Sequence, residues 1–185
     1  GAAAGGLWVS TDGGASWTTK TDLLPQVIGC SDLAFDPTNP SIMYLLTGDK
    51  DHGDTYSVGL LKSIDGGNTW SGTGLSFAVS QTMRMRKLLV DPSNGSNIII
   101  AGSSGIYRST DGGVTFSQKL TANTYDMLFK PGASDTLYAC GTEFYRSTDG
   151  GATWTKASTG IPSATSDGRM GLAVQLARED LCYLA

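Results

Sequence analysis

The sequence predicts an all-β protein built from repeated four-stranded antiparallel sheets, and three observations carry this prediction. Glycine supplies 25 of the 185 residues, against a usual share of about 7%, which indicates many tight turns between short strands. An eight-residue pattern, S-x-D-G-G-x-[ST]-[WF], occurs four times. A second pattern, two apolar runs around a turn, lies between those copies, and no segment shows a sustained helical period.

The eight-residue pattern predicts a hairpin turn. Its paired glycines can take positive φ at little steric cost, and its Asp and Ser side chains can hydrogen-bond nearby backbone groups. The aromatic residue then opens the next strand, where it can pack against a neighbouring sheet. We therefore assign structural roles to the Ser, Asp and aromatic positions of the four copies: Ser10, Asp12, Trp17, Ser63, Asp65, Trp70, Ser109, Asp111, Phe116, Ser147, Asp149 and Trp154.

The second pattern predicts the other half of each sheet. It occupies residues 33–46, 88–101, 127–140 and 172–185, which align without gaps. The first three copies carry Pro37, Pro92 and Pro131 at the same place in the turn, where the fourth has Leu176. Two strands, A and B, flank this turn, and two more, C and D, flank the eight-residue turn. Together they make a unit of about 40–50 residues, the size of a β-propeller blade.

Counting these units gives about four blade equivalents in one β-propeller region that spans residues 1–185. Strands C and D of a first half-blade occupy residues 6–21, and strands A and B of a last half-blade occupy 170–185. Three full blades lie between them, at 27–72, 87–121 and 125–158. We expect an arc of a larger propeller. The alternative is a closed four-bladed ring in which the two half-blades pair.

The four eight-residue boxes resemble the Asp-box, or bacterial neuraminidase, repeat. That family includes sialidases, xyloglucan-type endoglucanases, sortilin-type receptors and the photosystem II assembly propeller. Two longer segments are similar to those of secreted Bacteroidetes-type propellers that are glycosyl-hydrolase-like or sortilin-like: DPTNPSIMYLLTGD and, after it, GLLKSIDGGNTW. The resemblance implies a secreted or cell-surface bacterial protein, and it specifies a fold better than an activity, because Asp boxes occur in enzymes and non-enzymes alike.

The resemblance also implies which face of the blades binds ligands. Asp-box and A–B turns lie on one face, and the B–C and D–A connections lie on the other, which usually holds the ligand. Strand A is innermost and starts on that ligand side, so charged residues near its start are site candidates. Asp32 and Asp126 are candidates for a general acid/base pair in glycoside cleavage, and a polar rim around the channel mouth is the alternative. The candidate ligand-binding residues are Asp32, Tyr56, Arg84, Lys87, Tyr125, Asp126 and Arg169.

One ligand-side loop, residues 48–59, is longer than its counterparts and is acidic. Asp49, Asp51 and Asp54 could offer oxygen ligands to Ca²⁺, although the loop does not match the twelve-residue helical calcium motif. The alternative is a solvated acidic loop without a metal. His52 is the only histidine, and one histidine is a poor basis for a zinc site or a catalytic triad. Calcium is thus the one candidate cofactor.

Composition and missing motifs exclude several classes of function. The net charge of −4 and the lack of a basic stripe argue against nucleic-acid binding, and no apolar run approaches the length of a membrane span. A sialidase needs an arginine triad, a Tyr nucleophile with a supporting Glu, and an early F/Y-R-I-P motif. The chain has only two glutamates, Glu143 and Glu179, and lacks that motif. The early R-T-D-I-G-G segment of the xyloglucan-type endoglucanases is also missing, so at most half of such a site could be present.

The sequence therefore favours a non-catalytic extracellular propeller that binds glycan or protein on its B–C/D–A loop face. One alternative is a fragment of a glycoside hydrolase of the xyloglucan-type endoglucanase class. A second alternative is an assembly subunit, whose partners would be the rest of a parent propeller or other copies of the chain.

Overall fold

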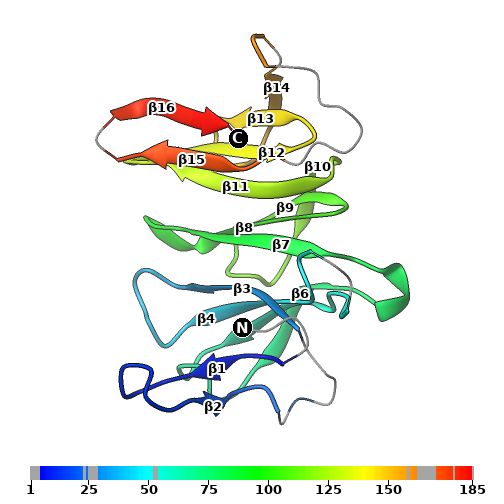
Figure 1. The fold of residues 1–185 in the computed structure, drawn as a ribbon, viewed down its shortest axis with the longest axis vertical. Helices are drawn as coiled ribbons and strands as arrows, with labels where there is room; N and C mark the ends of the chain where they lie inside the picture. Colours follow the sequence, from blue (N-terminus) through cyan, green and yellow to red (C-terminus); the bar gives the residue numbers. More distant parts are fainter. Residues whose placement is uncertain are drawn as a thin grey trace.

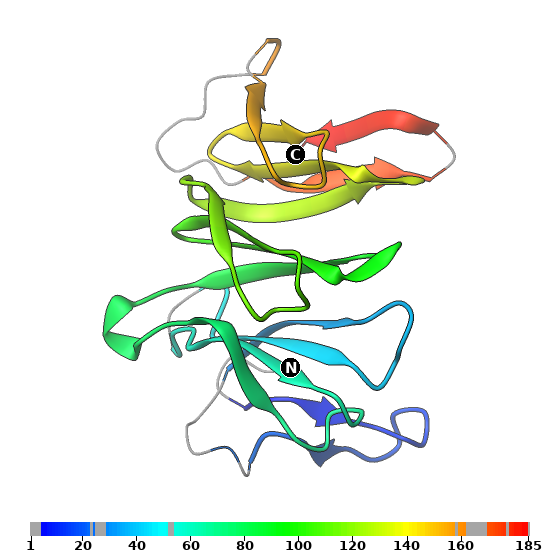
Figure 2. The same cartoon turned by 180° about the vertical axis from the view of Figure 1, so that it is seen from behind.

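The computed structural model describes residues 5–22, 24, 29–51, 54–157, 159–161, 170–176 and 178–184. Its strands form three four-stranded antiparallel sheets and two two-stranded sheets. The sheets follow one another in a stack, from β1–β2 at one end to β15–β16 at the other (Figure 1), and Figure 2 shows the same stack from behind. The described chain is thus an arc of blades, and its two half-blades remain separate sheets, unlike the closed ring that was the alternative.

Each full blade keeps its strands in chain order. The first half-blade is β1 (Trp8–Val9) and β2 (Thr18–Thr19). The first full blade is β3 (Cys30–Phe35), β4 (Met43–Thr47), β5 (Gly59–Ser63) and β6 (Ser71–Ser76). A 3₁₀ turn, η1 (Val79–Gln81), leads to the second, with β7 (Met85–Asp91), β8 (Asn94–Gly102), β9 (Gly105–Ser109) and β10 (Ser117–Leu120). The third is β11 (Thr124–Lys130), β12 (Ala133–Gly141), β13 (Phe144–Ser147) and β14 (Thr155–Ala157), and β15 (Leu172–Gln175) and β16 (Arg178–Leu184) follow.

These bounds differ from the expected blade limits mainly in one place. The fourth strand of the first full blade runs to Ser76, past the expected end at Gly72. The expected limits at residues 27, 158 and 185 lie outside the described residues.

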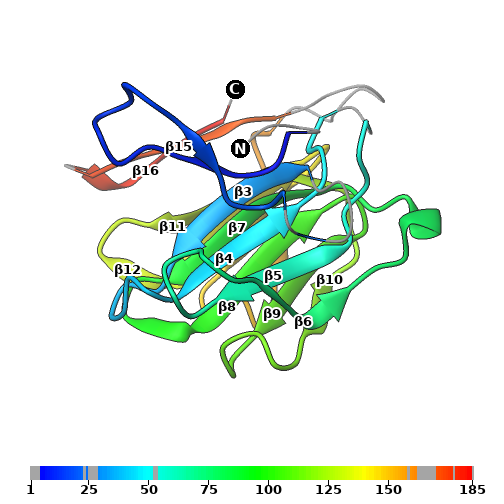
Figure 3. The ribbon, with the colours of Figure 1, turned by 90° about the horizontal axis from the view of Figure 1, so that it is seen from below.

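The A strands line one side of the stack. Figure 3 shows β3, β7, β11 and β15 on this side, with β6 and β10 on the other. Consecutive A strands are in contact: β3 with β7, β7 with β11, and β11 with β15. Strand A is therefore the inner strand of each blade, as the resemblance to propellers implied.

The apolar core lies between blades. One cluster joins the first and second full blades and contains Tyr44, Leu46, Leu60, Leu75, Met85, Leu88, Ile98 and Ile100. A second cluster joins the second and third and contains Ile99, Ala101, Ile106, Met127, Leu137 and Ala139. Ile98, Ile99 and Ile100 alternate between the two clusters, because successive side chains of a strand point to opposite faces. A central blade is thus buried on both faces.

Candidate functional site

Each Asp box closes its turn with the same hydrogen bonds. In the second box, Gly67 N donates to Ser63 Oγ (2.8 Å), and the amide and hydroxyl of Thr69 donate to Asp65 (2.9 and 2.6 Å). Asp12, Asp111 and Asp149 accept the corresponding bonds in the other boxes. The hydroxyl of Thr69, then its amide and then Ser63, lower the pKa of Asp65 to about 2. These are the contacts that a structural role requires.

The boxes and the A–B turns share one face of the blades. The first glycine of a box donates its N–H to the A–B turn of the same blade, as Gly66 does to Ser41 O (3.0 Å) and Gly112 to Ser96 O (3.0 Å). At the other end, the B–C loop meets the D–A connection, where Ser57 N donates to Met83 O (2.8 Å). The expected assignment of turns to two opposite faces is confirmed.

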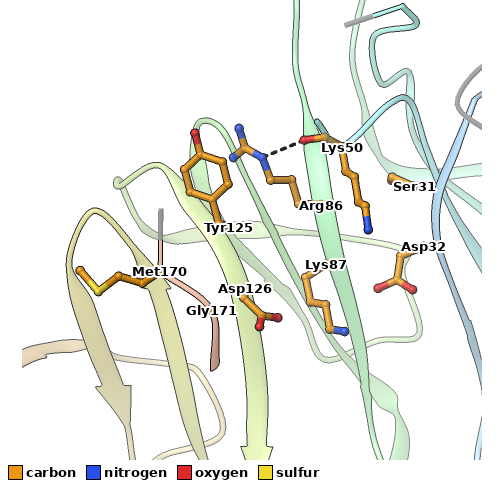
Figure 4. Close-up of a pocket in the computed structure, with 9 residues that line it drawn as sticks. All are labelled: Ser31, Asp32, Lys50, Arg86, Lys87, Tyr125, Asp126, Met170 and Gly171. Carbon is orange, nitrogen blue, oxygen red and sulfur yellow. Dashed lines mark hydrogen bonds between the residues drawn. The ribbon is translucent and has the colours of Figure 1, made fainter. Parts of the chain in front are cut away.

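A cavity of about 420 Å³ opens at the ligand-side end of the A strands. Its size falls within the range of small-molecule sites. It is lined by Ser31, Asp32, Lys50, Arg86, Lys87, Tyr125, Asp126, Met170 and Gly171 (Figure 4). A neighbouring cavity of about 450 Å³ shares Ser31, Asp32 and Lys50 and extends to Asp49 and Asp51.

The cavity is built from one bulge that recurs in three blades. The A–B register shifts between Cys30 and Asp32, between Met85 and Lys87, and between Thr124 and Asp126. A bulge adds one residue to a strand and redirects its side chain. The extra residues are Ser31, Arg86 and Tyr125, so each full blade presents two consecutive side chains to the cavity instead of one.

The two candidate catalytic carboxylates hold neighbouring A strands together. Asp32 accepts hydrogen bonds from Leu33 N and, in the next blade, from Leu88 N, both at 2.9 Å. Asp126 repeats the arrangement with Met127 N (2.9 Å) and, across the next interface, Leu172 N (3.1 Å). Both oxygens of each carboxylate thus accept main-chain amides. The acid/base role of this pair stays a prediction that the hydrogen bonding does not favour.

Lys87 occupies the equivalent position in the second full blade and cannot accept a hydrogen bond from an amide. Figure 4 shows its side chain between those of Asp32 and Asp126. The row of inner strands therefore presents negative, positive and negative groups in turn.

Two arginines on or next to β7 stack on tyrosines from other segments. The guanidinium carbon of Arg86 lies 4.0 Å from the ring centroid of Tyr125. That of Arg84 lies 5.9 Å from the ring of Tyr56, which comes from the long B–C loop. Tyr56 and Arg84 therefore pair with each other on the ligand side, but they do not line the cavity. Arg169 lies outside the described residues.

Sequence reasoning missed four lining residues: Ser31, Lys50, Arg86 and Met170. Three of them directly precede Asp32, Lys87 and Gly171, which the repeat alignment places at equivalent positions. The signal was thus the residue before each of these positions. For Ser31 and Arg86, the bulge of the A strand brings this residue to the cavity.

The acidic loop is held by its own backbone. Asp49 is 7% exposed, its Oδ1 accepts Asp51 N (3.0 Å), and its N–H donates to Thr55 O (2.8 Å). Over the described ranges, no three His, Cys, Asp or Glu side chains gather to hold a metal ion. Asp49, Asp51 and Asp54 are therefore not brought together as ligands, and calcium binding stays a prediction. His52 lies outside the described residues.

A Tyr–Glu pair lies on the third full blade, outside the cavity. Tyr145 is in β13, and its hydroxyl donates to Glu143, which lies just before that strand. The other carboxylate oxygen of Glu143 accepts a hydrogen bond from Lys156 Nζ. Burial and then this glutamate raise the pKa of Tyr145 to about 12. The phenol therefore keeps its proton at neutral pH, and the pair does not line the cavity.

Comparisons with known proteins agree with this architecture. The model of the BNR/Asp-box repeat matches residues 145–156. The chain is 37% identical over 134 residues to a xyloglucanase of Hypocrea jecorina, and 33% identical over 126 residues to a xyloglucanase of a Paenibacillus species. These alignments cover 65% and 62% of this chain but only 16% and 12% of the relatives, so the chain spans a small part of their length.

Solved structures show the same fold. An ancestral GH74 enzyme matches 85% of this chain with a TM-score of 0.67 and 19% identity, over 22% of its own length. The structure of YCF48 bound to D1 peptide matches 72% of this chain with a TM-score of 0.53 and 21% identity, over 40% of its length. The chain therefore has the fold and the repeat of the Asp-box β-propellers. The predicted fold class, an arc of such a propeller, is confirmed.

In the part of the chain that the structure describes, no helix has the length and apolar character needed to cross a membrane.

Proposed function

We propose that this chain is a glycan-binding arc of an extracellular propeller, and that it binds a neutral polysaccharide of the xyloglucan class without cleaving it. The observation that carries the proposal is the cavity at the start of the A strands. The names of the sequence relatives, which are xyloglucanases, support this ligand class.

The lining of the cavity has the chemistry that sugar recognition uses. Tyr125 offers an aromatic surface, and Ser31, Lys50 and Lys87 offer hydrogen-bonding groups. Arg86 packs on the Tyr125 ring at 4.0 Å and so fixes the orientation of this aromatic surface. Over the whole lining, the carboxylates of Asp32 and Asp126 lie with the cations Lys50, Arg86 and Lys87, so charge of either sign is largely compensated, which favours a neutral ligand over a strongly charged one.

The same contacts argue against cleavage by this chain alone. A general acid must hold a proton within reach of the glycosidic oxygen, and its partner must be free to activate water or to attack. Asp32 and Asp126 instead accept two main-chain amides each. Moving either carboxylate toward a substrate would leave amides of the inner strands without partners.

Affinity electrophoresis and calorimetry with xyloglucan test the proposal, with polygalacturonate as an acidic comparison. We expect the wild type to bind xyloglucan and Tyr125→Ala to bind about tenfold more weakly, because it loses the stacking surface. Trp17→Ala is the matched control, since this exposed aromatic lies on the Asp-box side. A wild-type protein that ignores xyloglucan, or prefers polygalacturonate, would refute the assignment.

A second candidate is a part of a xyloglucan-cleaving enzyme, and the sequence similarity to xyloglucanases favours it. The chain would then show turnover of xyloglucan, and Asp32→Asn or Asp126→Asn would abolish that turnover while the protein stayed folded. Binding without turnover would support the non-catalytic assignment.

A further inference from the structure

Arg86 occupies the bulge position of the central blade, and it is almost completely buried. Its exposed fraction is 6%, although it lines the cavity. Ser31 and Tyr125, the bulge residues of the neighbouring blades, are half-buried. The central bulge therefore directs its side chain into the protein, between two segments that themselves line the cavity.

The guanidinium joins those two segments. Nε donates to Lys50 O in the long B–C loop (3.0 Å). Nη1 donates to Asn123 Oδ1 (2.7 Å) and to Thr124 O (3.0 Å), at the entry to β11. The flat face of the same group packs on the Tyr125 ring at 4.0 Å. The segments it connects lie 36–38 residues away from it in sequence, on either side.

This combination needs an arginine. A guanidinium is planar, always charged, and offers several N–H donors in a fixed fork, and it can stack on an aromatic ring while it donates in its own plane. A lysine keeps the charge but is a single donor centre on a flexible stem. It cannot reach carbonyls on both sides and cover the ring at once.

We infer that Arg86 is a positioning residue, which sets the separation of Lys50 and Tyr125 across the cavity and thereby its affinity for glycan. Figure 4 shows Arg86 between these two residues, with its bond to the Lys50 carbonyl dashed. The glycan part of this inference rests on the proposed function, whereas the coupling of the two segments does not. Arg86 acts through Lys50 and Tyr125. It is not one of the ligand-binding residues that the sequence predicted.

Hydrogen exchange of Arg86→Lys tests the coupling without a ligand. We expect faster amide exchange in two separate regions, around Lys50 and around Thr124, and about tenfold weaker binding of xyloglucan, since bonds to a charged donor are lost. Arg108→Lys is the matched control: Arg108 Nε donates to Gly150 O (2.8 Å) on the Asp-box side. It should lower the melting temperature without changing exchange at the cavity or affinity.

Asn123→Ala provides a second variant that removes only one acceptor, from an exposed residue. We expect faster exchange around Thr124, little change around Lys50, and a smaller loss of affinity. Unchanged exchange in either region of Arg86→Lys would overturn the inference, as would equal losses of affinity in Arg86→Lys and Arg108→Lys. If both regions loosen but the wild type does not bind xyloglucan, the coupling is supported and the proposed glycan function is what fails.

Discussion

The two ends of the interface between neighbouring blades are held by opposite chemistry. At the ligand-side end, a carboxylate accepts an amide of the next inner strand, as Asp32 does from Leu88 N. At the Asp-box end, a cation donates to a carbonyl of the next box: Lys62 to Gly112 O (2.9 Å) and Arg108 to Gly150 O (2.8 Å).

The ends also differ in regularity. Both interfaces at the Asp-box end use the residue just before a box serine and the first glycine of the following box. At the ligand end, Asp32 and Asp126 repeat one contact, but Lys87 interrupts the series. The regular end fixes the stack of blades, and the end where the repeat varies is the one that carries a cavity. Variation within the repeat is thus a better guide to the candidate site than the repeat itself.

The largest expected effect comes from a glycine at the ligand end of strand C. A Cβ on Gly59 would lie 2.0 Å from Leu75 O, and its φ is +115°. We therefore expect Gly59→Ala to destabilise the protein by at least about 3 kcal/mol, since both backbone strain and a clash with main chain must be relieved. Gly72→Ala, in β6 of the same blade, is the control, because a Cβ there meets nothing within 4 Å. Chemical denaturation measures both, and similar losses would contradict the explanation.

The box aromatics should differ between a full blade and a half-blade. Trp154 is half-buried and packs against the second core cluster. Trp17, in the Asp box that joins β1 and β2 of the first half-blade, is 58% exposed. We expect Trp154→Ala to cost about 2–4 kcal/mol of unfolding free energy, somewhat below the range for a fully buried aromatic, and Trp17→Ala less than about 1 kcal/mol. Equal losses would mean that the half-blade is packed against another surface in solution.

The two kinds of interblade contact can be separated at one interface. Asp32→Asn removes one carboxylate acceptor, and Lys62→Met removes a donor that also lies over the Tyr44 ring at 5.3 Å. Each change should cost about 1 kcal/mol. Because the residues lie at opposite ends of the interface, the double variant should show the sum within about 0.5 kcal/mol. A strong departure from additivity in urea melts would show that the ends respond as one unit.

The sequence predicted what is local and repeated. The box turns and the A–B hairpins were found because their turn chemistry recurs in contiguous segments. The extent of β6 was missed because Gly72 and Gly74 are typical of loops, yet Gly74 sits where a Cβ would lie 2.1 Å from Val114 O in the next blade. A contact between blades therefore required the glycine in the strand.

The site was predictable in part for the same reason. Alignment of the repeats placed Asp32, Lys87 and Asp126 at one end of the inner strands, where the structure brings them together. It could not show that Asp32 bonds Leu88 N, 56 residues away, because that contact depends on how blades stack. Nor could it show the bulge that turns Arg86 inward, since a bulge is defined only by pairing with the neighbouring strand.

The smallest effect is expected from pH, and it should arise at the Asp-box end. Hydrogen bonds, first from the threonine hydroxyl and then from its amide, lower the pKa values of Asp65, Asp111 and Asp149 from 3.8 to about 2. A carboxyl whose pKa is lower in the folded state stabilises the fold fully above the unfolded pKa and loses this contribution as pH falls through the folded one. The melting temperature should therefore be nearly constant from pH 6 to 5 and fall most steeply between about pH 4 and 2. Asp65→Asn should have a lower melting temperature at pH 6 and a shallower acid slope, because this side chain no longer takes up a proton on unfolding. Parallel acid slopes for the wild type and Asp65→Asn would contradict this explanation for the box of Asp65.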